Sequence, residues 1–284
     1  MKLFKYTTEK GIDIIKNLRI LINPPNKFND PFEFFPTIAE EYEENEIKKD
    51  LEDIEVKKMV IHALKKEGLI PEDYQLDQYF FKDNHKMIIK YIKDTWPLKC
   101  EISCRKIIDI FSKKIGIFCT SLEDKNELLW SHYSDSHKGL LFEFNIPNIK
   151  NDDYEIYKVK YSSDRAKINP RLNRNKDLYS KELINTIITK SKSWKYEKEY
   201  RIFFPFNVCE KHNYNNKKIY FYNIKSNWIS RVVLGCRSSL KLKNDISKLL
   251  KKENLNHVIL EKSITSKDKF DFNYKGYDGS LFII

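Results

Sequence analysis

Two carboxylates and a guanidinium lie within one short aromatic segment, residues 194–204, whose sequence is Trp-Lys-Tyr-Glu-Lys-Glu-Tyr-Arg-Ile-Phe-Phe. In a strand, side chains alternate between two faces, so Glu197, Glu199 and Arg201 would share one face at spacings of about 7 Å. The opposite face is mostly aromatic and apolar, as expected of a side that packs on a core. Neighbouring carboxylates can exchange protons with a substrate. We therefore expect a functional site on this strand, and the alternative is a solvated face or a structural ion-pair ladder.

A second polar and aromatic segment, residues 130–139, precedes this strand. Trp130 and Tyr133 are three residues apart and share one face of a predicted helical turn, where core packing is the alternative to a functional role. His137 stands at a junction between a loop and a strand, where functional side chains are commonly displayed. His132 and His137 are five residues apart and do not share a helix face, so a two-histidine metal site is not expected within this segment.

Residues 28–33, with the sequence Phe-Asn-Asp-Pro-Phe-Glu, predict a rigid turn. The following proline pushes Asp30 toward an extended conformation, and Asn-Asp-Pro is a turn signal. Because two phenylalanines flank the turn, we expect it to be fixed to the core, with Asn29, Asp30 and Glu33 presented outward. We also expect the turn to line the same pocket as Glu199.

Composition limits the class of protein. The chain has 284 residues and a net charge of +11, and residues 151–284 hold 28 Lys and Arg against 15 Asp and Glu. Such a basic half attracts polyanions, so nucleic acid is a candidate partner, although a solubilising surface is the alternative. The sequence has no apolar run long enough for a membrane span and no signal peptide, so we expect a cytoplasmic protein. The five cysteines lack the spacing of a disulfide framework and favour buried thiols over a zinc site.

The order of periodic segments predicts one α+β domain over residues 1–284, with a mixed, mainly antiparallel sheet and a helical insertion over 40–114 on one side of it. Within the insertion, one helix is expected to stop before Pro97 and another to follow it. No phosphate loop or dinucleotide-binding glycine signature is present. The sequence outside the insertion predicts strands at 3–7, 19–22, 116–120, 140–144, 157–161, 219–222, 231–234, 258–260, 270–274 and 281–284.

Three stretches are distinctive in their order and spacing: Phe4-Lys5-Tyr6 through Phe28 to Glu33, Phe118 to Ser121 with Leu129 to Gly139, and Lys192 with Trp194 to Arg201. Together they resemble the bacterial family named domain of unknown function 2971. The resemblance covers about residues 3–240 and implies no established reaction. The helices of residues 40–114 are where we expect this chain to depart most from that family.

More weakly, the opening strand, helix and short strand, together with a distant Glu-x-Glu step, resemble ADP-ribosyltransferases. That resemblance implies cleavage of the nicotinamide–ribose bond of NAD, in which a carboxylate stabilises an oxocarbenium-like centre. Glu199 would be the catalytic carboxylate, and Glu197 would orient the acceptor. Tyr133 would supply an aromatic platform for nicotinamide. His137 or Arg201 would contact phosphate or ribose.

The first strand departs from those enzymes, because it carries Lys-Tyr-Thr where they have a histidine or arginine. NAD is the expected substrate, and no metal is predicted. The expected role is that of a toxin or phage-defence effector that modifies nucleic acid or protein. The remaining candidates for contacting substrate or cofactor are Tyr6, Asn29, Asp30, Trp130 and Lys192.

Two other functions stay open. A nuclease would use Glu197, Glu199, His137 and Lys192 as acidic, general-acid and phosphate-contacting groups, with or without a metal ion. A non-catalytic module would bind nucleic acid or a ligand through the basic residues 151–284 and through aromatic stacking in the 130–133 segment.

Overall fold

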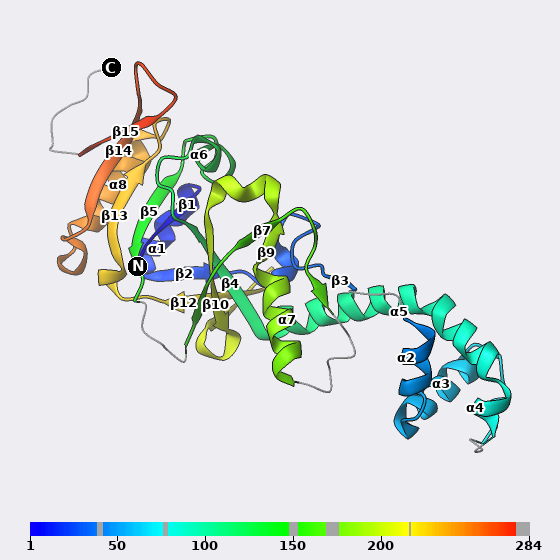
Figure 1. The fold of residues 1–284 in the computed structure, drawn as a ribbon. Coiled ribbons are helices and arrows are strands. Elements are labelled where there is room, and N and C mark those ends of the chain that lie inside the picture. Colours follow the sequence, from blue (N-terminus) through cyan, green and yellow to red (C-terminus); the bar gives the residue numbers. More distant parts are fainter. Residues whose placement is uncertain (39–41, 76–78, 148–152, 169–175, 216, 277–284) are drawn as a thin grey trace. The chain divides into compact units, whose positions relative to one another are not determined.

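The computed structural model describes residues 1–38, 42–75, 79–147, 153–168, 176–215 and 217–276 (Figure 1). The chain forms two compact units. The first, called the sheet unit, comprises Met1–Phe35, Ile108–Arg165 and Ile184–Ile284. The second, called the helical unit, comprises Pro36–Ile107 and Ala166–Leu183. The predicted strand at 281–284 lies outside the described residues.

An eight-stranded sheet forms the centre of the sheet unit (Figure 1). Its strands pair antiparallel except for β13 and β14, which are parallel. This mixed, mainly antiparallel sheet confirms the predicted α+β class. In spatial order the strands are β15 (Phe272–Gly276), β14 (Ile259–Thr265), β13 (Ile229–Leu234), β5 (Leu140–Asn145), β1 (Lys2–Thr7), β4 (Ile115–Ser121), β10 (Glu199–Pro205) and β6 (Glu155–Lys158).

Each face of this sheet has its own apolar cover. Helices α1 (Ile12–Asn17) and α8 (Leu240–Leu250) pack on one face, over a core that includes Phe118, Ile202 and Phe204. Helix α6 (Glu127–Tyr133) packs on the other face through Leu129 and Trp130. Alternation along β10 therefore turns Ile202 and Phe204 toward the first core and leaves Glu199 and Arg201 on the second face.

Smaller elements complete the sheet unit. Strands β11 (Glu210–Tyr214), β12 (Lys217–Asn223) and β2 (Arg19–Ile22) form an antiparallel sheet, which a bridge between Asn23 and Ile117 joins to β4. The predicted strand at 157–161 is divided, because β6 ends at Lys158 and β7 (Lys160–Ser162) pairs with β9 (Thr189–Ser191) instead. Short 3-10 turns are η1 (Glu9–Gly11), η2 (Pro25–Lys27), η5 (Phe206–Val208), η6 (Ser226–Trp228) and η7 (Glu253–Leu255).

The prediction of one strand over residues 194–204 was wrong in its first half. Residues Lys192–Glu197 form the 3-10 helix η4, and β10 begins only at Glu199. Ser191 starts the turn by accepting a hydrogen bond from the backbone of Ser193. Lys198 ends it in the left-handed conformation, with φ 43°. Aromatic residues occur in both strands and turns, so alternation alone could not locate this break.

The helical unit has a separate apolar core. Its elements include α2 (Glu44–Asp50), α3 (Ile54–Lys66), α4 (Phe80–Asp83), the first part of α5 (His85–Lys114), most of α7 (Lys176–Ile188), and strands β3 (Thr37–Ile38) and β8 (Lys167–Ile168). Ile47, Leu64 and Ile88 are fully buried in its core. The prediction of a helix end before Pro97 was wrong, because α5 continues through it. A proline removes only one backbone donor, and the long flanking helix keeps the rest of its hydrogen bonds.

The described helices also bear on the membrane prediction. None of them is both long and apolar enough to cross a membrane.

Candidate active site

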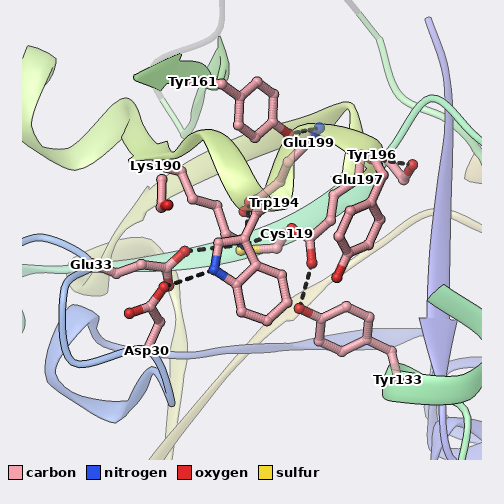
Figure 2. Close-up of polar contacts among 12 residues, drawn as sticks. Asp30, Glu33, Cys119, Tyr133, Tyr161, Lys190, Trp194, Tyr196, Glu197 and Glu199 are labelled. Carbon is pink, nitrogen blue, oxygen red and sulfur yellow. Dashed lines mark hydrogen bonds and ion pairs between the residues drawn. The ribbon is translucent and has the colours of Figure 1, made fainter. Parts of the chain in front are cut away.

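Three carboxylates surround one buried ammonium group on the α6 face of the sheet (Figure 2). The Nζ of Lys190 lies 2.5 Å from Glu197 Oε2, 3.0 Å from Glu199 Oε2 and 3.1 Å from Glu33 Oε1. All four side chains are at most 7% exposed. Water therefore screens these charges weakly, and each depends on the others for stability.

A guanidinium forms the second positive group of this cluster. Arg201 is fully buried, and its Nε donates to Glu199 Oε1 at 2.9 Å. Its two terminal nitrogens donate to Glu33 Oε1 and to the backbone carbonyl of Ile187, both at 2.7 Å. The cluster of Glu33, Lys190, Glu197, Glu199 and Arg201, called here the ion cluster, has three negative and two positive groups.

Local structure explains how distant residues meet in the ion cluster. Glu199 and Arg201 are two apart on β10 and share a face. Strand β9 supplies Lys190, and the left-handed residue Lys198 turns the chain so that Glu197 approaches the same ammonium. The turn at residues 28–34 supplies Glu33. It is held by Trp194, whose Nε1 donates to Asp30 Oδ2 at 2.9 Å.

Hydrogen bonds from outside the ion cluster fix the two glutamates. The hydroxyl of Tyr133, on α6, donates to Glu197 Oε1 at 2.6 Å. The backbone carbonyl of Glu197 accepts from Ser121 Oγ at 2.5 Å. The backbone N–H of Glu199 donates to the Tyr161 hydroxyl at 2.7 Å. Figure 2 shows that Tyr133 and Tyr161 approach this pair from different elements.

The pKa values of the two glutamates shift in opposite directions. Burial alone would raise the pKa of Glu199, but Arg201 and Lys190 stabilise its carboxylate and lower the pKa to about 2. Burial raises the pKa of Glu197 above its ordinary value, and this effect and the repulsion from Glu199 together exceed the stabilisation by Lys190 and Tyr133. Burial would lower the pKa of Lys190, but the three carboxylates raise it above its ordinary value. Two carboxylates whose acidities are pushed apart are suited to different roles in one reaction.

A cavity of about 270 Å³ opens beside the ion cluster. Strands β1 and β4 pair at Phe4 and Ser121. Next to this pair, the ammonium of Lys5 on β1 donates to the backbone carbonyl of Cys119 on β4 at 2.9 Å. The lining includes both acidic groups, Glu33, Glu197 and Glu199, and basic groups, Lys5, Lys27 and Lys190. Its lining residues are Phe4, Lys5, Tyr6, Leu21, Asn23, Lys27, Phe28, Asn29, Glu33, Ile117, Phe118, Cys119, Thr120, Ser121, Leu129, Tyr133, Lys190, Glu197 and Glu199.

Several predicted site residues lie together at this cavity. Glu197, Glu199, Tyr133, Tyr6 and Asn29 line it, so the 28–33 turn and Glu199 face one space. Two of the other five predicted residues contact groups of the site. Arg201 contacts Glu199 from within the sheet, and Asp30 holds Trp194.

Other predicted positions need correction. Trp130 is fully buried, with its ring centroid 5.3 Å from that of Tyr6, so it serves the core and cannot stack on a ligand. His137 does not line the cavity and packs instead against Phe272, at 5.5 Å between ring centroids. Lys192 is exposed on η4 and also does not line it. Glu33 was predicted to point outward but is buried, because Lys190 and Arg201 neutralise it.

Sequence reasoning missed the two cations that organise the cavity. Lys190 follows the apolar residues Ile187 and Ile188 and one threonine. A single charge in this position was the one feature of the sequence that could have marked it as a buried site residue. Lys5 lies between two aromatic residues on β1, and nothing in that local pattern assigned it a role at the site. The described residues contain no group of three or more His, Cys, Asp or Glu side chains arranged to hold a metal ion.

Comparison with known proteins gives one match. No curated protein and no solved structure shows significant similarity to the chain. Residues 129–202 match the family model described as "Protein of unknown function (DUF2971)". That segment contains Tyr133, Lys190, Glu197, Glu199 and Arg201. The part of the chain that is similar to this family therefore supplies all of the ion cluster except Glu33.

Proposed function

We propose that the cavity binds NAD and breaks its nicotinamide–ribose bond, transferring ADP-ribose to an acceptor. The observation that supports this function best is the pair Glu197 and Glu199. They line one cavity together with aromatic residues, and the pKa of Glu197 is raised whereas that of Glu199 is lowered. Cleavage at a ribose carbon requires a group that stays negative beside developing positive charge and a second group that handles a proton.

Glu199 is suited to the first role. Its low pKa keeps it ionised throughout the neutral range. As the bond between C1′ and the nicotinamide nitrogen breaks, the electron pair moves to nicotinamide, and positive charge develops on the ribose. A fixed carboxylate lowers the energy of that state, and Lys190 and Arg201 hold Glu199 in place at 3.0 and 2.9 Å.

Glu197 is suited to the second role. An acceptor hydroxyl or amine that bonds to C1′ must lose a proton, and a carboxylate with a raised pKa is a better base than an ordinary one. The proton passes to Glu197 as the new bond to C1′ forms. Tyr133 orients this carboxylate through its 2.6 Å hydrogen bond.

The remaining lining residues fit the rest of such a substrate. Aromatic rings such as Phe28 and Tyr133 offer faces for the nicotinamide ring. Lys5 and Lys27, which also line the cavity, offer positive charge for phosphate. The nuclease alternative is less well supported, because it needs His137 and Lys192, which the cavity does not include.

The experiment follows nicotinamide release and label transfer from labelled NAD, with the protein alone and with single-stranded DNA, RNA or cell lysate. Wild type is compared with Glu199→Gln and Glu197→Gln. Glu101→Gln, on an exposed helical ion pair, is the matched control. We expect Glu199→Gln to lower the rate about 100-fold or more, as removal of one group that stabilises the transition state does.

Circular dichroism establishes that each variant is folded. Turnover by Glu199→Gln equal to that of wild type, or no turnover by folded wild type under any of these conditions, would overturn the proposal.

A further inference from the structure

The small β2–β12–β11 sheet has one buried face and one open face. Ile20 and Ile22 are buried on the inner side, where Tyr220 stacks on Phe206 at 3.7 Å between ring centroids. The opposite side faces outward because side chains alternate along each strand. The residues of this outer side, called here the hairpin face, are Arg19, Leu21, Glu210, His212, Tyr214, Lys217, Ile219, Phe221 and Asn223.

The hairpin face offers flat aromatic groups. Phe221 pairs across the sheet with Leu21, and the His212 ring packs edge-on against it at 5.4 Å. The guanidinium of Arg19 lies 4.0 Å from the Phe221 ring centroid and is itself held by Asp13. Tyr214, at the end of β11, is 67% exposed. Aromatic faces of this kind stack on unpaired nucleic-acid bases whatever their sequence.

The same hairpin is basic. Lys217 is exposed on the hairpin face, and Lys211 and Lys218 are exposed on the opposite side of the same two strands, against the single carboxylate of Glu210. Glu210 lies 3.5 Å from His212 and accepts a hydrogen bond from Asn223. On the hairpin face, Lys217 lies opposite Tyr214 and Arg19 lies beside Phe221, so cations and aromatic groups adjoin there, as a strand with both phosphates and exposed bases requires.

The hairpin face leads into the cavity. Leu21 is 43% exposed on the hairpin face and also lines the cavity, as does Asn23 at the end of the same strand. Lys27, exposed and six residues beyond Leu21, lines the cavity as well. A chain that lies along the hairpin face therefore reaches, at Leu21, the cavity that Glu197 also lines.

We propose that the hairpin face binds single-stranded nucleic acid and presents it to the cavity as the acceptor. The binding surface stands on the hairpin alone, whereas the acceptor role rests on the proposed function. A duplex is the poorer fit, because its bases are already stacked and unavailable to the exposed ring of Tyr214.

Binding is tested without NAD, by fluorescence anisotropy of a labelled 12-nucleotide single strand and of a duplex of the same length at two salt concentrations. The test variant is Tyr214→Ala/Lys217→Glu. The control, Phe270→Ala/Lys248→Glu, removes a fully exposed aromatic ring and makes the same charge change away from the hairpin. We expect the test variant to bind the single strand at least tenfold more weakly, with a smaller dependence on salt, and the control to bind within twofold of wild type.

Equal binding by wild type and the test variant, or binding of duplex as tight as that of single strand, would overturn the surface assignment.

The acceptor role is tested separately by transfer of label from NAD to the oligonucleotide. The test variant should lose this transfer and keep nicotinamide release in the absence of oligonucleotide. Label transfer that persists in the test variant would overturn the acceptor role. If the wild type releases no nicotinamide, the proposed function is refuted, but the anisotropy result on binding is unaffected.

Discussion

Replacing Glu199 by Gln tests whether the ion cluster depends on an ionised carboxylate at this position. Arg201 is fully buried and donates to both carboxylate oxygens of Glu199, at 2.9 and 3.3 Å. Gln keeps the size of the side chain but removes its charge. Arg201 and Lys190 would then share only Glu33 and Glu197, so we expect the variant to be less stable at pH 7.

The magnitude follows from the acidity of Glu199. Its pKa changes from an ordinary 4.5 to about 2 in the folded protein. That change corresponds to about 3 kcal/mol of stability, at about 1.4 kcal/mol for each tenfold change in the acidity constant. Because the folded-state pKa is the lower one, this stability is fully present above pH 4.5 and is lost as the pH falls toward 2. The difference between wild type and variant should shrink over the same range.

Urea unfolding at pH 7, 5 and 3.5 measures this difference. In a Trp96→Phe background the remaining three tryptophans, Trp130, Trp194 and Trp228, all belong to the sheet unit, so fluorescence follows that unit. The control is again Glu101→Gln, which we expect to change stability by less than about 1 kcal/mol because its pair is exposed. A loss below about 1 kcal/mol for Glu199→Gln at pH 7, or a loss that does not decline in acid, would refute the reasoning.

Two further substitutions test the contacts around the ion cluster. Tyr133→Phe removes the donor to Glu197, so the pKa of Glu197 should rise further, and nicotinamide release at pH 6 should fall about tenfold while release at pH 8 changes less. An equal fall at both pH values would contradict the role of Tyr133. Trp194→Phe removes the hydrogen bond to Asp30 and should lower the free energy of unfolding in urea by about 1 kcal/mol. Unchanged stability would show that this bond does not fix the 28–34 turn.

The sequence was sufficient for the strand part of residues 194–204. Side chains alternate reliably where a strand lies inside a sheet, so the separation of Glu199 and Arg201 from Ile202 and Phe204 could be predicted and was confirmed. The preceding turn was not predictable by the same rule. The left-handed conformation of Lys198 depends on contacts made elsewhere in the fold, and lysine has no intrinsic preference for it.

The partners of the site were harder to predict than its glutamates. Glu33 and Arg201 are 168 residues apart, and nothing local marks Glu33 as buried, because a charged residue after a proline turn is usually exposed. Trp130 shows the opposite limit. Its spacing from Tyr133 placed both on one helix face, but the structure buries the indole and leaves only Tyr133 at the cavity. Residue spacing predicts which side chains share a helix face, whereas the burial of each side chain depends on the elements that pack against that face.

The rate of nicotinamide release from NAD between pH 5 and 9, measured with and without single-stranded DNA, tests the central claim most directly. The account predicts release by the wild type with a decline on the acid side at a pH above 4.5, as Glu197, whose pKa burial raises, becomes protonated. That acid limb should disappear in Glu197→Gln, whose remaining rate should be low and flat. No release at any pH from folded wild-type protein, or the same acid limb in wild type and Glu197→Gln, would contradict the account.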